Sequence, residues 1–104
     1  MVSCEEEGIP ENVLKKEAFV PVFTDVQILE ATYKQRIVQT TNKDSLMSLG
    51  YAHIFQKHNI DKETFERSFT WWTEQPEAMA EVYDEVEARI LEMESDLRNE
   101  INEN

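Results

Sequence analysis

The sequence has few of the residues that form the turns of small β folds, with two glycines and three prolines in 104 residues. So few turn-forming residues favour a few long helices over many short strands. The single cysteine, Cys4, excludes a disulfide within the chain. No apolar run approaches the roughly 18 residues that a membrane-spanning helix requires. The sequence therefore predicts one small all-α domain.

Basic residues are also scarce, with 10 Lys and Arg against 22 Asp and Glu, and the net charge is −12. Residues 51–104 alone hold 14 acidic and 5 basic residues, a net charge of −9. This charge repels phosphate backbones, so we expect no nucleic-acid binding. It also argues against electrostatic docking on anionic lipid. An acidic surface keeps a chain soluble and can select basic partners.

Cys4 follows a short stretch of small residues and precedes the acidic run Glu5–Glu7. This arrangement resembles the lipid-attachment box of a bacterial lipoprotein whose signal peptide is missing. A thiol in a polar tail is not buried by its own surroundings, and lipidation would cap it. The alternative is a start that happens to place a cysteine near the terminus. We expect residues 1–11 to form a lipoprotein-like tether and residues 12–104 to form the helical domain.

Apolar residues recur at spacings of three and four, which predicts a small bundle of about four helices. We place Pro21 in the first turn of the main helix, where its missing N–H costs nothing. A first helix is predicted to begin near residues 11–14, with a break near 18–21. Further helices are predicted over residues 21–38, 44–58, 62–74 and 76–101.

Several boundaries carry specific signals. Asn59 can adopt the left-handed conformation that ends a helix. Asp61 is a good N-cap, and Ile60 and Phe65 flank it at the spacing of a hydrophobic staple. Pro76 suits the first position of the last helix.

The last helix is predicted to be the longest, at roughly 39 Å. Its apolar residues follow a heptad spacing over nearly three repeats, so its distal part can project beyond the shorter helices. The stripe comprises Met79, Tyr83, Val86, Ile90, Met93 and Leu97. The predicted core comprises Phe19, Phe23, Val26, Leu29, Tyr51, Ile54, Phe55, Phe65, Phe69, Trp72, Met79, Tyr83 and Val86.

The two histidines, His53 and His58, do not indicate a metal site. Five residues apart, they fall on different helix faces, and neither forms the Glu-x-x-His pair of dinuclear bundles. Zinc requires more Cys or His ligands than the chain has. We expect His58 to interact with the dipole of a helix C-terminus and His53 to be an interfacial polar residue. No metal and no cofactor are predicted.

Ser68 is a hydroxyl on an aromatic helix face, but the sequence shows no oxyanion hole for a nucleophile. We expect it to bond the carbonyl of Thr64, four residues earlier. Two glycines cannot build a phosphate-binding loop, so the sequence predicts no enzyme. Trp71 and Trp72 point about 100° apart, so one can enter the core while the other stays at a rim. An exposed tryptophan there could anchor a partner. The interpretation that we favour is instead two partly buried tryptophans that pack against the last helix.

Three motifs follow one another along the predicted helices, namely Tyr51-x-x-Ile54-Phe55-x-Lys57-His58-x-Ile60, Phe65-x-x-Ser68-x-x-Trp71-Trp72-x-x-x-Pro76-Glu77 and Tyr83-Asp84-x-Val86. With these motifs the chain resembles, over about residues 10–95, the small bacterial lipoproteins classed as domain of unknown function 4296. The resemblance implies an all-helical envelope lipoprotein without assigned activity or catalytic residues. The sequence departs from relatives in its Trp-Trp pair, where Tyr is frequent, and in the missing signal peptide. The acidic triplet after Cys4 resembles signals that direct lipoproteins to the outer face of an outer membrane.

We therefore expect a non-enzymatic binding or assembly module, anchored to a membrane of the bacterial envelope through lipid on Cys4 alone. Its partner would be an unidentified envelope protein. Two alternatives remain open, namely self-association into a homo-oligomer through the last helix and a peptide-holding, chaperone-like groove. The candidate partner-binding residues are Trp71, Trp72, Ile90, Met93 and Leu97.

Overall fold

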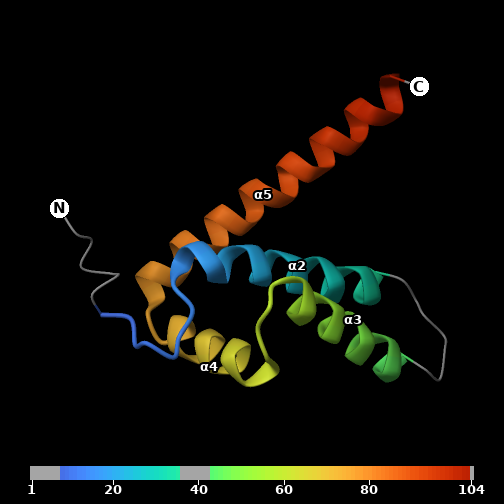
Figure 1. Ribbon diagram of the computed structural model, residues 1–104. Coiled ribbons are helices and arrows are strands. Elements are labelled where there is room, and N and C mark those ends of the chain that lie inside the picture. Colours follow the sequence, from blue (N-terminus) through green and yellow to red (C-terminus); the bar gives the residue numbers. More distant parts are fainter. Residues whose placement is uncertain (1–7, 36–42, 104) are drawn as a thin grey trace.

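A computed structural model describes residues 8–35 and 43–103 (Figure 1). These residues form four helices and no strands, so the predicted all-α bundle with a long C-terminal helix is confirmed. The helices are α2 (Lys16–Gln35), α3 (Lys43–Lys57), α4 (Lys62–Thr73) and α5 (Pro76–Glu103). The predicted end of the first long helix at Val38 lies outside the described residues.

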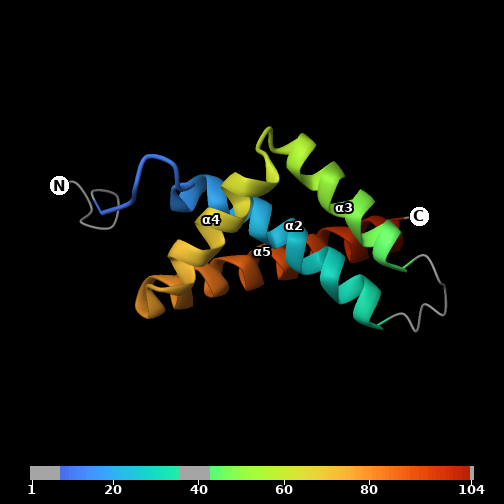
Figure 2. The ribbon, with the colours of Figure 1, turned by 90° about the horizontal axis from the view of Figure 1, so that it is seen from below.

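The central helix of the bundle is α2, which contacts both α3 and α5, while α4 also packs against α5. Figure 2 shows α3 and α4 running in different directions from the turn that joins them, with α2 beside both. Figure 1 shows α5 crossing α2 and then leaving the other helices, so that its last turns project. The segment at residue 8 and the end of α5 lie at opposite ends of the molecule in that view.

The start of α2 differs from the prediction. No helix forms over the described residues before Lys16, and Pro21 lies inside α2 rather than in its first turn. The Lys15 carbonyl accepts the first bonds of the helix, from the N–H groups of Ala18 (3.0 Å) and Phe19 (2.8 Å). A proline inside a helix costs about 3 kcal/mol. Burial of Phe19 and Val20, both ahead of the proline, offsets that cost.

The turn between α3 and α4 is confirmed as predicted. Asn59 has a φ of 56°, and its N–H bonds the Gln56 carbonyl while the Ile60 N–H bonds the Phe55 carbonyl. These two bonds form a Schellman motif. Asp61 then caps α4 by accepting the Thr64 N–H at 2.7 Å.

The core lies where α2 meets the other helices, around a set of stacked aromatic rings. The Phe19 ring stacks at 5.3–6.0 Å on the rings of Phe23, Phe65 and Trp72. Most of the predicted core is buried, and Leu29 and Tyr51 are partly buried against it. The prediction was wrong for two residues, because Phe69 and Tyr83 are 37% and 46% exposed. The buried hydrophobic residues that it missed are Val13, Val20, Val22 and Val82.

Close contacts join α2 to its neighbours on both sides. A Cβ added to Gly50 of α3 would lie 2.6 Å from Leu29 Cδ1, so this glycine lets the two helices approach closely. At the other end of α2, Lys16 Nζ lies 2.7 Å from a Glu85 carboxylate oxygen and 3.5 Å from one of Glu81, both on α5. Contact with α3 therefore lies in the second half of α2, and the ion pairs with α5 lie at its first turn.

Candidate functional site

The chain segment ahead of α2 is bound by two buried side chains of α4. Ser68 Oγ accepts the Leu14 N–H at 2.8 Å, and Trp72 Nε1–H donates to the Leu14 carbonyl at 2.9 Å. Four residues apart, Ser68 and Trp72 lie on the same face of α4. Arg67 adds a third bond, from its guanidinium to the Asn12 carbonyl at 3.0 Å. We call residues 9–14 the strap, because they fasten the start of the chain across α4.

The strap settles the roles of two candidate residues. Ser68 is fully buried, and the bond that the structure shows for its hydroxyl is long-range, not the local bond to Thr64 that was expected. Trp72 is 1% exposed, so its ring cannot reach a partner protein. Both side chains serve the packing of the domain.

The strap also bears on the predicted tether. Ile9 packs against the core and the Pro10 carbonyl accepts the Val13 N–H at 3.1 Å, so residues 9–11 belong to the folded part. The predicted lipid-attachment residue, Cys4, lies outside the described residues.

Trp71 is the half-buried member of the tryptophan pair. Its ring meets that of Trp72 edge-on, with centroids 5.0 Å apart and planes at 87°, and it packs against the core. Part of the Trp71 ring remains accessible. The expectation of two partly buried tryptophans is therefore wrong for Trp72, which is 1% exposed, and the pair has one core and one rim member.

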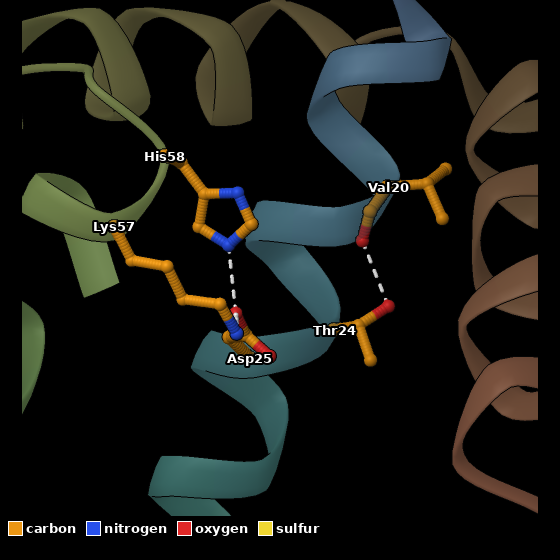
Figure 3. Close-up of polar contacts among 5 residues, drawn as sticks. All are labelled: Val20, Thr24, Asp25, Lys57 and His58. Carbon is orange, nitrogen blue, oxygen red and sulfur yellow. Dashed lines mark hydrogen bonds and ion pairs between the residues drawn. The ribbon is translucent and has the colours of Figure 1, made fainter. Parts of the chain in front are cut away.

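A polar cluster joins α2 to the end of α3 (Figure 3). Asp25 Oδ2 lies 2.7 Å from His58 Nε2 and 3.0 Å from Lys57 Nζ. Burial acts to raise the pKa of the Asp25 carboxyl, but the hydrogen bonds from His58 and Lys57 outweigh it and hold that pKa below its usual value. The sequence placed His58 at a helix end but could not reveal its carboxylate partner. His53 is exposed rather than interfacial.

An apolar groove lies between α3 and α4, with a volume of about 850 Å³. A smaller hollow of about 200 Å³ shares Tyr51, Phe65 and Phe69 with the groove and adds Phe23 and Tyr83. Phe69 and Tyr83, the two predicted core residues that are exposed, therefore line these hollows. The full lining of the larger groove is Ser48, Tyr51, Ala52, Phe55, Lys62, Phe65, Glu66, Phe69 and Thr70.

One edge of the groove is fixed by a bond across helices. The Tyr51 hydroxyl donates to the Glu30 carboxylate of α2. Burial, reinforced by this bond and by the negative charge of Glu30, raises the pKa of Tyr51 to about 12. At neutral pH the Tyr51 hydroxyl therefore keeps its proton and donates this bond, which holds the ring in place.

The last turns of α5 expose the other apolar surface. Ile90 is half-buried against the core, whereas Met93, Leu97 and Ile101 are 45%, 58% and 64% exposed. We call these last three residues the distal stripe. Three of the five candidate contact residues, Ile90, Met93 and Leu97, thus lie on one row of α5, and Ile101, which the prediction did not include, extends it.

Two further features concern the part of the chain that the structure describes, namely metal-binding clusters and membrane-spanning helices. Within residues 8–35 and 43–103, no three His, Cys, Asp or Glu side chains gather in a way that could hold a metal ion. Over the same described ranges, no helix has the length and apolar character needed to cross a membrane.

The comparisons with known proteins agree with the resemblance seen in the sequence. No curated protein and no solved structure matches this chain. A family model with the description "Domain of unknown function (DUF4296)" matches residues 10–96, from the strap to the distal stripe. The chain therefore belongs to the family of the domain of unknown function 4296.

Proposed function

We propose that this chain is a non-enzymatic protein-binding module of the bacterial cell envelope, held at a membrane by lipid on Cys4. The observation that carries the binding role is the uncovered apolar row at the end of α5. Met93, Leu97 and Ile101 are 45–64% exposed, and the last turns of α5 project from the other helices (Figure 1). Burying a side chain of this kind is worth about 1.5–3 kcal/mol, so a partner that covered the row would gain several such contributions.

The regular spacing of these three residues indicates a binding surface and not a set of unrelated exposed apolar side chains. Single exposed apolar residues are ordinary on soluble proteins, whereas an aligned set marks an interaction site. The three residues are four apart, so they follow one another along one face of the helix. The same face is buried further back, at Met79 and Val86, where other helices cover it.

Crosslinking in cells tests the proposal. The chain is expressed behind a lipoprotein signal peptide in a bacterium that carries the natural gene, with a photoreactive amino acid at Leu97 or at Ser95. Ser95 points to the other side of α5, since helix positions advance about 100° per residue. We expect a discrete adduct with another envelope protein from Leu97 and none from Ser95. Adducts of equal yield at both positions, or at neither, would contradict the proposal.

The same experiment separates the two alternatives. An adduct of Leu97 with a second copy of the chain would favour self-association through α5. A third position, Phe69, reports on the groove, whose volume and aromatic lining suit an extended peptide. Adducts with many unfolded proteins from Phe69, and none from Leu97, would favour the peptide-holding role.

Lipidation of Cys4 has its own test. We expect the protein extracted from envelopes to carry a diacyl or triacyl mass, and Cys4→Ala to lack this mass and to leave the membrane fraction. The proposal rests on the residues around Cys4 and on the resemblance to small lipoproteins. An unmodified Cys4 in a protein recovered without membranes would overturn the proposed location.

A further inference from the structure

We propose that the partner segment seated on the distal stripe is an amphipathic helix with basic residues on both sides of its apolar seam. This inference rests on the proposed function and specifies the chemistry of the partner. Four observations support it: the width of the stripe, its continuity with the core, the charges along its edges, and the poor fit of other occupants.

The stripe has the width of a helix–helix seam. Met93, Leu97 and Ile101 advance by four residues each, so at about 100° per residue they span only about 80° of the helix surface. They cover about 12 Å of helix length. So narrow a row matches the seam between two helices, which is narrower than the face that a helix presents to a globular core.

The stripe also continues an existing helix-packing surface. Going back along α5, the same row includes Ile90, which is half-buried, and Val86 and Met79, which are buried. Those positions pack against other helices of the bundle, because α2 and α4 both contact α5. A partner helix on Met93 and Leu97 would extend this packing past the end of the bundle.

Acidic residues border the stripe on both edges. At about 100° per residue, Glu94 lies next to one edge, and Asp96 and Glu100 lie next to the other. The nearest basic residues are Arg98, farther round the helix from Ile101, and Arg89, which lies on the same edge as Asp96 and Glu100 but one turn before Met93. All five are exposed. A partner with Lys or Arg on both flanks of its seam would meet opposite charge on each side.

Two other occupants fit less well. In a parallel pair of copies, the residue seven after Met93 is Glu100, so a carboxylate would replace an apolar residue at the seam. Each copy also carries a net charge of −12, and their acidic edges would face each other. An anionic membrane surface would meet the same repulsion.

The test uses two synthetic helical peptides of about five turns with the same Leu and Ile seam, one flanked by Lys and one by Glu. We expect the Lys peptide to bind the full-length chain at least tenfold more tightly than the Glu peptide, and more weakly as salt rises. Leu97→Ser should weaken the Lys peptide at least tenfold. Amide exchange should slow at residues 91–102 on binding and stay unchanged around Phe69.

Charge reversal isolates the role of the edges. We expect the double variant Asp96→Lys, Glu100→Lys to lose the preference for the Lys peptide. The matched control, Asp84→Lys with Glu92→Lys, changes net charge equally but lies away from the stripe, and it should keep most of that preference. Equal binding of both peptides, equal effects of the two double variants, or protection mapped to the groove would overturn the inference. If Leu97 still crosslinks to an envelope protein in cells when one of these results is found, the binding module stands and only its partner class is wrong.

Discussion

Replacing Trp72 with alanine is expected to lower the free energy of unfolding by about 4 kcal/mol, a large share of the stability of a domain this size. The indole is 1% exposed. It stacks on Phe19 with centroids 5.8 Å apart, and its Nε1–H holds the Leu14 carbonyl. The variant loses the packing and leaves that carbonyl without its bond, so the strap should detach as well. Urea denaturation of the full-length chain measures the loss.

Two companion variants separate packing from hydrogen bonding. Trp72→Phe keeps an aromatic ring against Phe19 but lacks the donor, so we expect a loss of about 2 kcal/mol. Trp71→Ala removes the half-buried neighbour and should cost only about 1 kcal/mol. If Trp71→Ala costs as much as Trp72→Ala, the assignment of Trp72 as the core member of the pair is wrong.

Replacing Asp25 with alanine is expected to cost about 2 kcal/mol at pH 7, because the carboxylate accepts charge-assisted bonds from His58 and Lys57. The half-buried His58 ring would also lose its partner. Chemical denaturation of the wild-type chain and the variant at pH 7 gives the difference directly.

The same contribution should disappear in acid. The pKa of Asp25 is lower in the folded chain than the usual value of about 3.9. The folded state therefore favours the ionised carboxyl, and its stabilisation is complete above the unfolded pKa and is lost as pH falls through the folded pKa. The gap in stability between the wild type and Asp25→Ala should hold from pH 7 down to about 5 and narrow below about 4.

A matched variant controls for the general loss of negative charge. Asp84 is an exposed aspartate on α5, so Asp84→Ala should change stability by less than about 0.5 kcal/mol at any of these pH values. A gap for Asp25→Ala that widened as pH fell below about 4 would contradict the sign of the pKa shift.

The features predicted correctly from the sequence are those set by local chemistry. Asn59 and Asp61 end one helix and begin the next through bonds between residues at most five positions apart. Pro76 is the first residue of α5, as its local preference for that helix position predicted. The exposed row at the end of α5 was predictable because its period is regular and α5 is longer than its neighbours.

The features that were missed depend on contacts between distant residues. Pro21 was predicted in the first turn of the main helix, after a break near residues 18–21, but burial of Phe19 and Val20 favours a helix that continues through it. Residues 9–11 of the strap were predicted to belong to a polar tether, because the side chains that bind the strap, Ser68 and Trp72, come more than 50 residues later. The pairing of His58 with Asp25 was not predicted, because these two residues are also far apart in the sequence.

The groove was missed because it depends on the directions of helices. Phe69 and Tyr83 lie on apolar helix faces, which predicts burial. Phe69 is exposed because α3 and α4 diverge from their shared turn, which leaves the groove between them open (Figure 2). Tyr83, on α5, is exposed at the smaller hollow that it shares with Phe69. A hydrophobic pattern indicates which side of a helix is apolar, but it does not contain the angle at which the neighbouring helix crosses.

The strap has a mechanical consequence. A pull applied to the N-terminus reaches the fold first at residues 9–14, where the bonds of Leu14 to Ser68 and Trp72 resist it. Both of those bonds end on α4, so the load passes into α4 while the first turn of α2 stays shielded until Leu14 is released. Force applied through an anchor at that end would therefore leave α2 folded, and with it the surface against which α5 packs.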